Sequence, residues 1–206
     1  MNFTALVMAG GRASRMGLGV EKPLLEVSGK SMLQRVVEVL KQSPALDRII
    51  VATSTMTPAT SLEAEQLGVE TIVAPGQGFE EDMRFAIRRL SLNDVLIVSA
   101  DLPFIRVDII EQAMQKYRNS GKPALAVMTR REVYEKLGSK PQYIFKINGE
   151  DLAPIGINII DGRRIDEEEL DQTVFIIEPT DALNVNTPQD LEVARKKEAV
   201  EWSSPK

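Results

Sequence analysis

The stretch best suited to chemistry follows the first apolar run of the chain. Residues 9–17 read AGGRASRMG, and residues 21–24 read EKPL. Two adjacent glycines let a backbone approach an anion closely and expose its N–H groups. Three cations lie within eleven residues, and a triphosphate is the anion that would need that many. The candidate nucleotide-binding residues in this stretch are Ala9, Gly10, Gly11, Arg12, Arg15 and Lys22.

The glycine spacing does not match either standard phosphate loop, G-x-x-x-x-G-K-[ST] or G-x-G-x-x-G. A flexible turn with solvated basic side chains is therefore an alternative interpretation, and for the glycine pair alone it is the better one. The pair together with Arg12, Arg15 and Lys22-Pro23 favours a phosphate-binding loop.

Asp101 is the candidate metal ligand. It follows the apolar stretch 95–99 within the sequence Ala100-Asp101-Leu102-Pro103. A carboxylate at the end of a strand can hold Mg²⁺ against phosphate oxygens, or it can cap the next helix. A cationic phosphate loop nearby favours the metal, with Mn²⁺ as the alternative ion.

Three later residues are candidates for acceptor binding. Asn186 precedes the last helix, where its side-chain oxygen could ligate the same metal, bind a nucleotide hydroxyl, or form a local turn. Gly156 enters a strand and Asn158 follows it; a glycine there marks a close ligand approach or a bulge. We expect Gly156, Asn158 and Asn186 to line the acceptor site.

The segment 76–82, GQGFEED, precedes a predicted helix. It could line a base pocket, in which backbone groups of Gly76 and Gly78 and the carboxylate of Asp82 read base edges. The alternative is a glycine turn followed by acids that favour a helix start. We prefer this second interpretation for Glu80 and Glu81.

The composition limits the chemistry. The chain has 206 residues, a net charge of -5, and neither cysteine nor histidine. Thiolate chemistry and the usual ligands of zinc and haem are excluded, so a metal must bind oxygen ligands. The negative charge disfavours nucleic acid as a partner, and the N-terminal apolar run is too short to span a membrane. We therefore expect a cytoplasmic protein.

The elements that position these residues alternate between strands and helices. Strands are predicted at 3–8, 48–52, 71–73, 95–99 and 124–128, and helices at 31–41, 80–90 and 107–117. Further strands are predicted at 142–146, 155–160, 174–177 and 183–185, before a last helix from Thr187-Pro188 toward Ala199. The alternation predicts a three-layer α/β fold, a mostly parallel twisted sheet with helices on both faces, whose ligands gather at the carboxyl ends of its strands. Residues 1–200 would form one domain and 201–206 a frayed tail.

Residues 9–17 and 21–24 resemble the signature loop of the nucleotidyltransferase superfamily, which has a glycosyltransferase-A-like, Rossmann-like nucleotide-diphospho-sugar transferase fold. Residues 100–104, ADLPF, are more similar to the molybdenum cofactor guanylyltransferases. Five segments are more similar to the archaeal adenosylcobinamide-phosphate guanylyltransferases: GVEKPL at 19–24, GQGFEED at 76–82, ALAVM at 124–128, PIGIN at 154–158 and NVNT at 184–187. The similarity spans about residues 3–195.

The resemblance implies an Mg²⁺-dependent enzyme that moves GMP from GTP to adenosylcobinamide phosphate and releases pyrophosphate. It implies that Arg15, Lys22 and Asp101 carry catalysis, with Asp101 and Asn186 as metal ligands. Ala13 departs from the pattern, since the family has Gly or Ser there. Molybdenum cofactor guanylyltransferase, cytidylyltransferase and a non-catalytic nucleotide-binding regulatory module are the alternatives, and whether the chain forms a homodimer is open.

Overall fold

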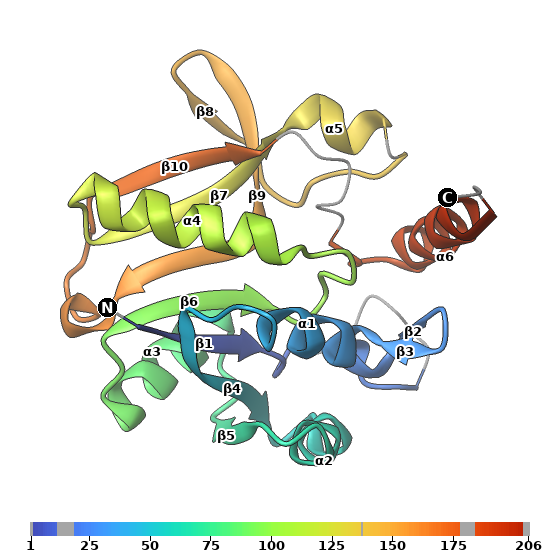
Figure 1. Ribbon diagram of the computed structural model, residues 1–206, viewed down its shortest axis with the longest axis horizontal. Helices are drawn as coiled ribbons and strands as arrows, with labels where there is room; N and C mark the ends of the chain where they lie inside the picture. Colours follow the sequence, from blue (N-terminus) through green and yellow to red (C-terminus); the bar gives the residue numbers. More distant parts are fainter. Residues whose placement is uncertain (1, 12–18, 137, 178–183, 204–206) are drawn as a thin grey trace.

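A mixed, mostly parallel sheet forms the centre of the computed structural model, which describes residues 2–11, 19–136, 138–177 and 184–203 (Figure 1). The strand order is β10-β7-β9-β6-β1-β4-β5, and β8 pairs with β9. β9 runs antiparallel to β6, β7 and β8, while the other neighbours in this order are parallel. The strands are β1 (Phe3–Met8), β4 (Leu46–Ser54), β5 (Glu70–Ala74), β6 (Asp94–Ser99), β7 (Ala124–Arg130), β8 (Phe145–Ile147), β9 (Glu150–Asp161) and β10 (Gln172–Ile177).

Helices cover both faces of this sheet, as the sequence predicts. In Figure 1, α1 (Met32–Leu40) and α4 (Val107–Ser120) lie in front of it and α3 (Phe79–Leu90) lies behind. Successive side chains of a strand point to opposite faces. Accordingly, Val7 belongs to the core on the α1 and α4 side, whereas Leu6 belongs to the core on the α3 side. The two cores pack against both faces of the central strands and so fix the position of the residues at the carboxyl ends of these strands.

The long connection after β1 is more structured than the sequence predicts. It contains the 3-10 helix η1 (Lys22–Leu24) and a small hairpin of β2 (Glu26–Val27) and β3 (Lys30–Ser31). Ser31 then caps α1, because its hydroxyl accepts a hydrogen bond of 2.9 Å from the Gln34 amide.

Two short helices were not predicted, α2 (Pro58–Gln66) and α5 (Arg131–Lys136). α2 buries only Thr60 and Ala64, so it leaves no apolar periodicity to detect. The strand predicted at 142–146 forms instead at β8, nearer the turn that joins it to β9.

The strand predicted at 183–185 is wrong for its described part, Asn184 and Val185, which are irregular; residue 183 lies outside the described residues. The Val185 amide donates to the carbonyl of Asp101 at 3.0 Å, and the chain then turns into α6 (Pro188–Ser203). α6 extends four residues past Ala199 and packs against the β2–β3 hairpin. Within the described ranges, no helix is both long and apolar enough to cross a bilayer.

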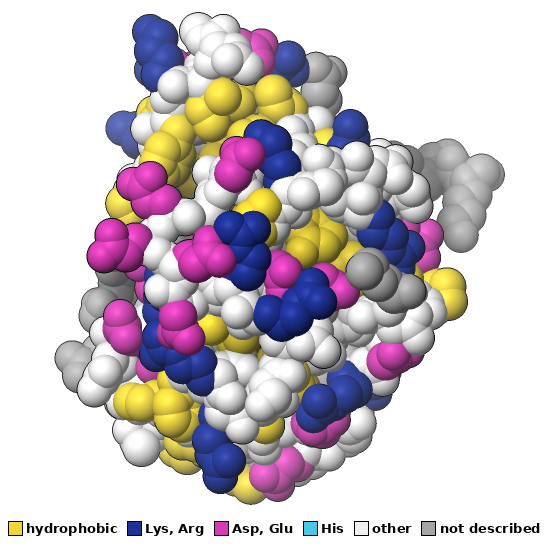
Figure 2. All heavy atoms as spheres, turned by 90° about the vertical axis from the view of Figure 1, so that its left-hand side faces the viewer, with side chains coloured by type: hydrophobic (Ala, Val, Ile, Leu, Met, Phe, Trp, Pro, Cys, Tyr) yellow, Lys and Arg dark blue, Asp and Glu magenta, His cyan; other side chains and the backbone are white. Residues whose placement is uncertain are grey.

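The surface at the amino ends of the parallel strands is mixed in character. Figure 2 shows acidic and basic side chains interspersed over this face, and hydrophobic side chains gathered in a hollow toward its top, where the β8 hairpin lies. A separate apolar cluster on the β10-β7-β9 side of the sheet consists of buried Ala126, Met128 and Leu152, with partly buried Ile147, Val174 and Ile176 packed against it. We call these six residues the β7–β9 apolar cluster.

Candidate active site

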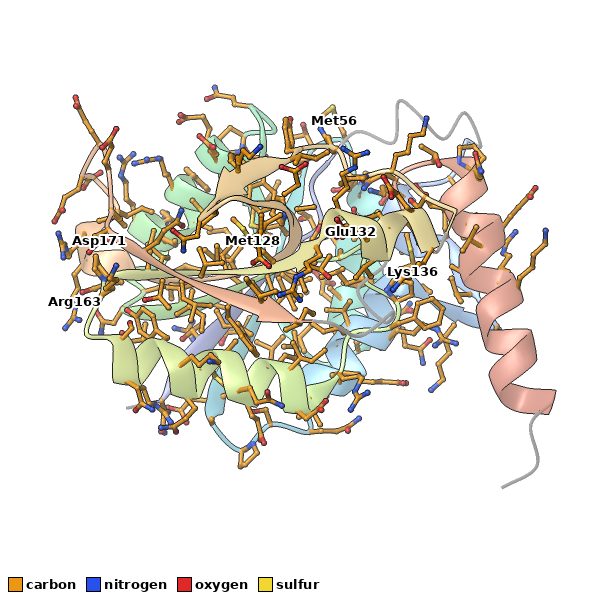
Figure 3. All side chains as sticks on the ribbon, turned by 90° about the horizontal axis from the view of Figure 1, so that it is seen from above. Met56, Met128, Glu132, Lys136, Arg163 and Asp171 are labelled. Atoms are coloured by element: carbon orange, nitrogen blue, oxygen red, sulfur yellow. The ribbon has the colours of Figure 1, made fainter. Side chains whose placement is uncertain are left out.

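A cavity of about 580 Å³ lies at the carboxyl ends of β1, β5 and β6, where ligands gather in sheets of this kind. Its volume suits a small-molecule ligand. Met56, labelled in Figure 3, contributes to the wall after β4. The predicted site residues that line the cavity are Ala9, Gly10, Gly11, Lys22, Gly76, Gly78, Asp82 and Asp101. Arg12 and Arg15 lie outside the described residues.

Lys22, Asp101 and Asn186 meet at one point although they are far apart in sequence. The Lys22 ammonium donates to Oδ2 of Asp101 and, at 2.8 Å, to Oδ1 of Asn186. The side chains of Lys22 and Asp101 are only 18% and 13% exposed. η1 positions the lysine, since buried Pro23 follows it within the helix. The sequence prediction thus selected three residues that the fold brings together.

This cluster fits a hard divalent cation. The carboxylate oxygen of Asp101 and the amide oxygen of Asn186 converge on the same positive charge. Mg²⁺ prefers oxygen ligands and is usually bound by one or two carboxylates together with substrate phosphates and water. No three acidic side chains gather into a metal site anywhere in the described residues. Asp101 and Asn186 would supply part of the coordination shell, and substrate phosphates and water could supply more.

The two glycines after β1 have different surroundings. A Cβ at Gly10 would lie 3.2 Å from the Cβ of Ser54, and the Ser54 hydroxyl donates to the Gly10 carbonyl at 2.9 Å. A Cβ at Gly11 would meet nothing within 4 Å. Gly10 is therefore packed against the end of β4, while no described residue crowds the Cβ position of Gly11. Ser54 follows the same strand-end rule that identified Asp101, but the sequence analysis did not single it out.

Asp82 lines the cavity but is engaged by its own loop. Its Oδ1 accepts hydrogen bonds from the amides of Gly76, at 2.8 Å, and Gln77, at 3.1 Å. The side chain is buried, so in this structure it holds the loop before α3 instead of presenting that oxygen to a base. Gln77 and Phe79, which belong to the segment 76–82 but were not singled out as site residues, also line the cavity, and Phe79 is 47% exposed.

Glu21 anchors the loop that carries Lys22. Its carboxylate accepts hydrogen bonds from the amides of Ala59, at 2.9 Å, and Thr60, at 2.6 Å, and from the Thr60 hydroxyl. These amides belong to the first turn of α2, whose own N-cap Thr57 makes no side-chain capping hydrogen bond, because its hydroxyl pairs with the Ser54 backbone instead. A carboxylate is favourable at a helix N-terminus, so Glu21 caps α2 from a distant part of the chain.

The predicted acceptor residues on β9 lie beside the cavity and do not line it. Gly156 has φ +83°, and a Cβ there would lie 2.9 Å from the Cβ of Ser99 and 3.0 Å from Nδ2 of Asn184. Asn158 is half-buried within the sheet, in register with Ile97 of β6. Asn186 instead belongs to the Lys22 cluster.

Comparisons with known proteins agree with this geometry. Residues 5–163 match the family model described as a MobA-like NTP transferase domain. The chain is 33% identical over 204 residues to an adenosylcobinamide-phosphate guanylyltransferase of Methanocaldococcus jannaschii, an alignment that covers 92% of this chain and 94% of the relative. It is 28% identical over 129 residues to a probable molybdenum cofactor guanylyltransferase of Pyrococcus horikoshii, covering 60% of this chain and 61% of that one.

Solved structures of nucleotidyltransferases share the fold. A CMP:2-keto-3-deoxy-manno-octonic acid synthetase solved with CTP superposes with a TM-score of 0.81 at 17% identity, covering 98% of this chain and 100% of that one. Molybdopterin-guanine dinucleotide biosynthesis protein A from Archaeoglobus fulgidus gives a TM-score of 0.67 at 18% identity, covering 96% of this chain and 99% of that one. The chain belongs to the MobA-like NTP transferase family and is an NTP-dependent nucleotidyltransferase.

Proposed function

We propose that this protein transfers GMP from GTP to adenosylcobinamide phosphate and releases pyrophosphate. The observation that carries the proposal is the juxtaposition of two features at Gly156. On one side is the polar cluster of Lys22, Asp101 and Asn186; on the other, β9 leads to the β7–β9 apolar cluster. The relative from Methanocaldococcus jannaschii, which aligns along nearly the whole chain, supports the choice of acceptor.

The reaction would be an in-line attack of an acceptor phosphate oxygen on the α-phosphorus of GTP. The acceptor phosphate is already anionic at neutral pH, so no general base is needed, which suits a chain without histidine. Positioning and charge neutralisation then carry catalysis. Lys22 would bind the triphosphate, and the glycine pair would bind it through backbone N–H groups. Asp101 and Asn186 would hold Mg²⁺, which neutralises charge on the phosphates.

The surface beside the β7–β9 apolar cluster suits an acceptor with a large apolar body. The β8 hairpin adds Tyr143, Ile144 and Phe145, each of which exposes about half of its side chain. A corrin offers apolar area that such a surface can bury, whereas a pterin is smaller and more polar. In Figure 3, Met128 lies on β7 in the middle of the sheet, where Ile147 of the hairpin packs against its cluster.

The decisive experiment measures pyrophosphate release with each of the four NTPs, crossed with adenosylcobinamide phosphate, molybdopterin and sugar phosphates, with and without Mg²⁺. We expect release only with GTP, adenosylcobinamide phosphate and Mg²⁺ together. Release with molybdopterin alone would move the assignment to molybdenum cofactor synthesis, for which the Pyrococcus horikoshii relative is the precedent. Release with CTP and a sugar or alcohol phosphate would replace it with a cytidylyltransferase.

A pair of variants tests the acceptor surface. Phe145→Lys places a charge on the exposed strand β8, and we expect KM for adenosylcobinamide phosphate to rise about tenfold, which corresponds to ~1.4 kcal/mol. KM for GTP should stay unchanged. Val73→Lys is the matched control, since Val73 is similarly exposed and lies on β5, the edge strand of the sheet far from β8 and β9 in the strand order. An equal rise in both variants would remove the acceptor surface from the proposal.

A further inference from the structure

A chain of side-chain hydrogen bonds runs from α5 to Asp101, on the side away from Lys22. The Tyr134 hydroxyl lies 3.1 Å from Oδ1 of Asn184, and Nδ2 of Asn184 lies 3.4 Å from Oδ1 of Asp101. Tyr134 is 4% exposed, so its hydroxyl is shielded from water. Fifty residues separate Tyr134 from Asn184 in sequence, and 83 separate Asn184 from Asp101.

The chemistry of the three groups fixes the direction of this chain. An ionised carboxylate only accepts hydrogen bonds, so Asn184 must turn its NH₂ group toward Asp101. Its carbonyl oxygen then faces Tyr134, whose hydroxyl must donate. Burial, followed by the nearby charges of Asp101 and Asp190, raises the pKa of Tyr134, so the hydroxyl keeps the proton that it donates.

The surrounding backbone leaves room for the Asn184 amide and for little else. A Cβ at Gly156 would lie 3.0 Å from Nδ2 of Asn184, closer than side chains normally pack. The next residue, Val185, donates its amide to the carbonyl of Asp101. The space that Gly156 leaves therefore lets the amide reach the carboxylate.

A second connection joins the segments that carry Tyr134 and Asn184. The Ser139 amide donates to the Tyr134 carbonyl at 3.0 Å, and the Ser139 hydroxyl donates to Asp190. The other carboxylate oxygen of Asp190 accepts from the amides of Asn186, at 3.0 Å, and Thr187, at 2.9 Å. The tyrosine is therefore held at a fixed place relative to both asparagines.

We propose that Tyr134 is a positioning residue that acts through Asn184. It orients the amide so that the NH₂ group holds one oxygen of Asp101 and leaves the other oxygen directed at Lys22 and the site of Mg²⁺. The inference rests on the proposed role of Asp101 as a metal ligand. Asn184 consequently acts as a hydrogen-bond donor to Asp101, which leaves Asn186 as the amide ligand.

Tyr134→Phe tests this role, because it removes the hydroxyl and keeps the ring. Groups that orient metal ligands typically contribute 10- to 100-fold, so we expect the Mg²⁺ concentration for half-maximal turnover to rise about tenfold and kcat to fall about tenfold. KM for GTP at saturating Mg²⁺ should not change. Tyr117→Phe is the matched control, since Tyr117 is also buried and its hydroxyl lies 3.5 Å from a different carboxylate, Oδ1 of Asp94.

A double-mutant cycle separates positioning from packing. Asn184→Leu removes the amide at similar size and should shift the Mg²⁺ dependence at least as far as Tyr134→Phe. Combining both substitutions should cost no more than Asn184→Leu alone, because Tyr134 acts through the amide. Additive effects, or a Mg²⁺ dependence in Tyr134→Phe equal to that of the control, would overturn the proposal. If Tyr134→Phe does not fold, a wild-type Mg²⁺ dependence in Asn184→Leu would overturn it equally.

A binding measurement keeps this inference distinct from the choice of acceptor. Mn²⁺ affinity in the presence of GTP, followed by electron paramagnetic resonance, needs no acceptor. We expect about tenfold weaker Mn²⁺ binding in Tyr134→Phe than in Tyr117→Phe. Weaker Mn²⁺ binding in Tyr134→Phe, together with no turnover of adenosylcobinamide phosphate by the wild type, would refute the proposed acceptor but support the positioning role of Tyr134. Equal Mn²⁺ affinity in the two variants would refute the positioning role.

Discussion

The two ends of the parallel strands carry polar groups of opposite character. At the carboxyl ends the Lys22 cluster is shielded and long-range: Lys22 reaches Asp101 and Asn186 across 79 and 164 residues. At the amino ends the basic partners of the ion pairs are exposed. Arg48 and Glu70 pair there with side chains 41% and 54% exposed, and Arg163 pairs with Asp161 only two residues away. Figure 2 shows how these charges spread over the surface.

This difference separates charges that serve solubility from charges that serve chemistry. An exposed ion pair contributes about 0–1 kcal/mol to stability, because water screens it. A shielded pair loses hydration when the protein folds, so it is weak evidence for stability. The cluster around Lys22 is therefore better explained by the ligand that it binds. Each prediction below tests this division.

The largest expected effect is on turnover, at the carboxyl ends. Lys22→Met and Asp101→Asn should each lower kcat about 100-fold, since each removes about 3 kcal/mol of transition-state stabilisation. Steady-state kinetics with GTP measures the effect. Arg48→Met, which breaks an exposed pair at the amino ends, should leave kcat unchanged and alter the free energy of unfolding by less than about 1 kcal/mol.

Near-wild-type turnover in both Lys22→Met and Asp101→Asn, with folding confirmed by circular dichroism, would remove the proposed site. A large loss of activity in Arg48→Met would instead remove the contrast between the two ends.

Gly156 and Gly149 form a matched pair on the same hairpin. Both have positive φ, +83° and +86°, so alanine at either position is strained by about 1–2 kcal/mol. Only Gly156→Ala also crowds Ser99 and Asn184, which should add about 1–3 kcal/mol. We expect urea unfolding to show the larger loss for Gly156→Ala, and turnover to fall in that variant alone. Equal losses of stability in the two variants would mean that Gly156 is needed for its backbone conformation and not for the space that it leaves beside Ser99 and Asn184.

Residue type and strand position were enough to predict the cluster itself. Lys22 lies in a motif, and Asp101 follows an apolar strand, so elementary rules place both at the ligand edge. The same alternation predicted the three-layer fold. The direction of β9 could not be predicted, because an apolar run such as its residues 155–160 is typical of a buried strand in either orientation.

The supporting contacts were beyond sequence reasoning for a different reason. Tyr134 lies on a six-residue helix and reaches Asn184 only because tertiary packing brings that helix close to the irregular segment before α6. Glu21 caps a helix that begins 37 residues later, and no local capping pattern records that contact. A side chain whose partner is distant in sequence leaves no local sequence pattern. A side chain that follows an apolar strand can be located from that strand.

Glu21 is predicted to have the next largest effect. Glu21→Ala removes the cap of α2, which should cost about 1 kcal/mol in the free energy of unfolding. Because the same carboxylate holds the loop of Lys22, kcat should fall by up to about fivefold. Glu65→Ala, at an exposed position of α2, is the control and should change neither quantity. Loss of stability with full activity would show that the cap is independent of the catalytic loop.

The smallest effect belongs to Tyr117, at the amino ends. Burial, followed by the charges of Asp94 and Asp161, raises the pKa of Tyr117 from 10.0 to about 12. The folded state therefore holds this proton more tightly than the unfolded state. The resulting stability is complete below about pH 10 and is lost as the pH rises toward about 12. Urea unfolding at several alkaline pH values should show a shallower decline in Tyr117→Phe than in the wild type.

Turnover at neutral pH should be unchanged in Tyr117→Phe, because its carboxylate partners lie at the amino ends of the parallel strands, away from Asp101. Tyr134, the buried tyrosine at the carboxyl ends, should affect turnover, because its partner Asn184 donates a hydrogen bond to the proposed metal ligand Asp101. An identical alkaline decline in Tyr117→Phe and the wild type would show that Tyr117 binds its proton equally in both states. A loss of neutral turnover in the variant would show that the amino ends influence catalysis, and the division between the two ends would then fail.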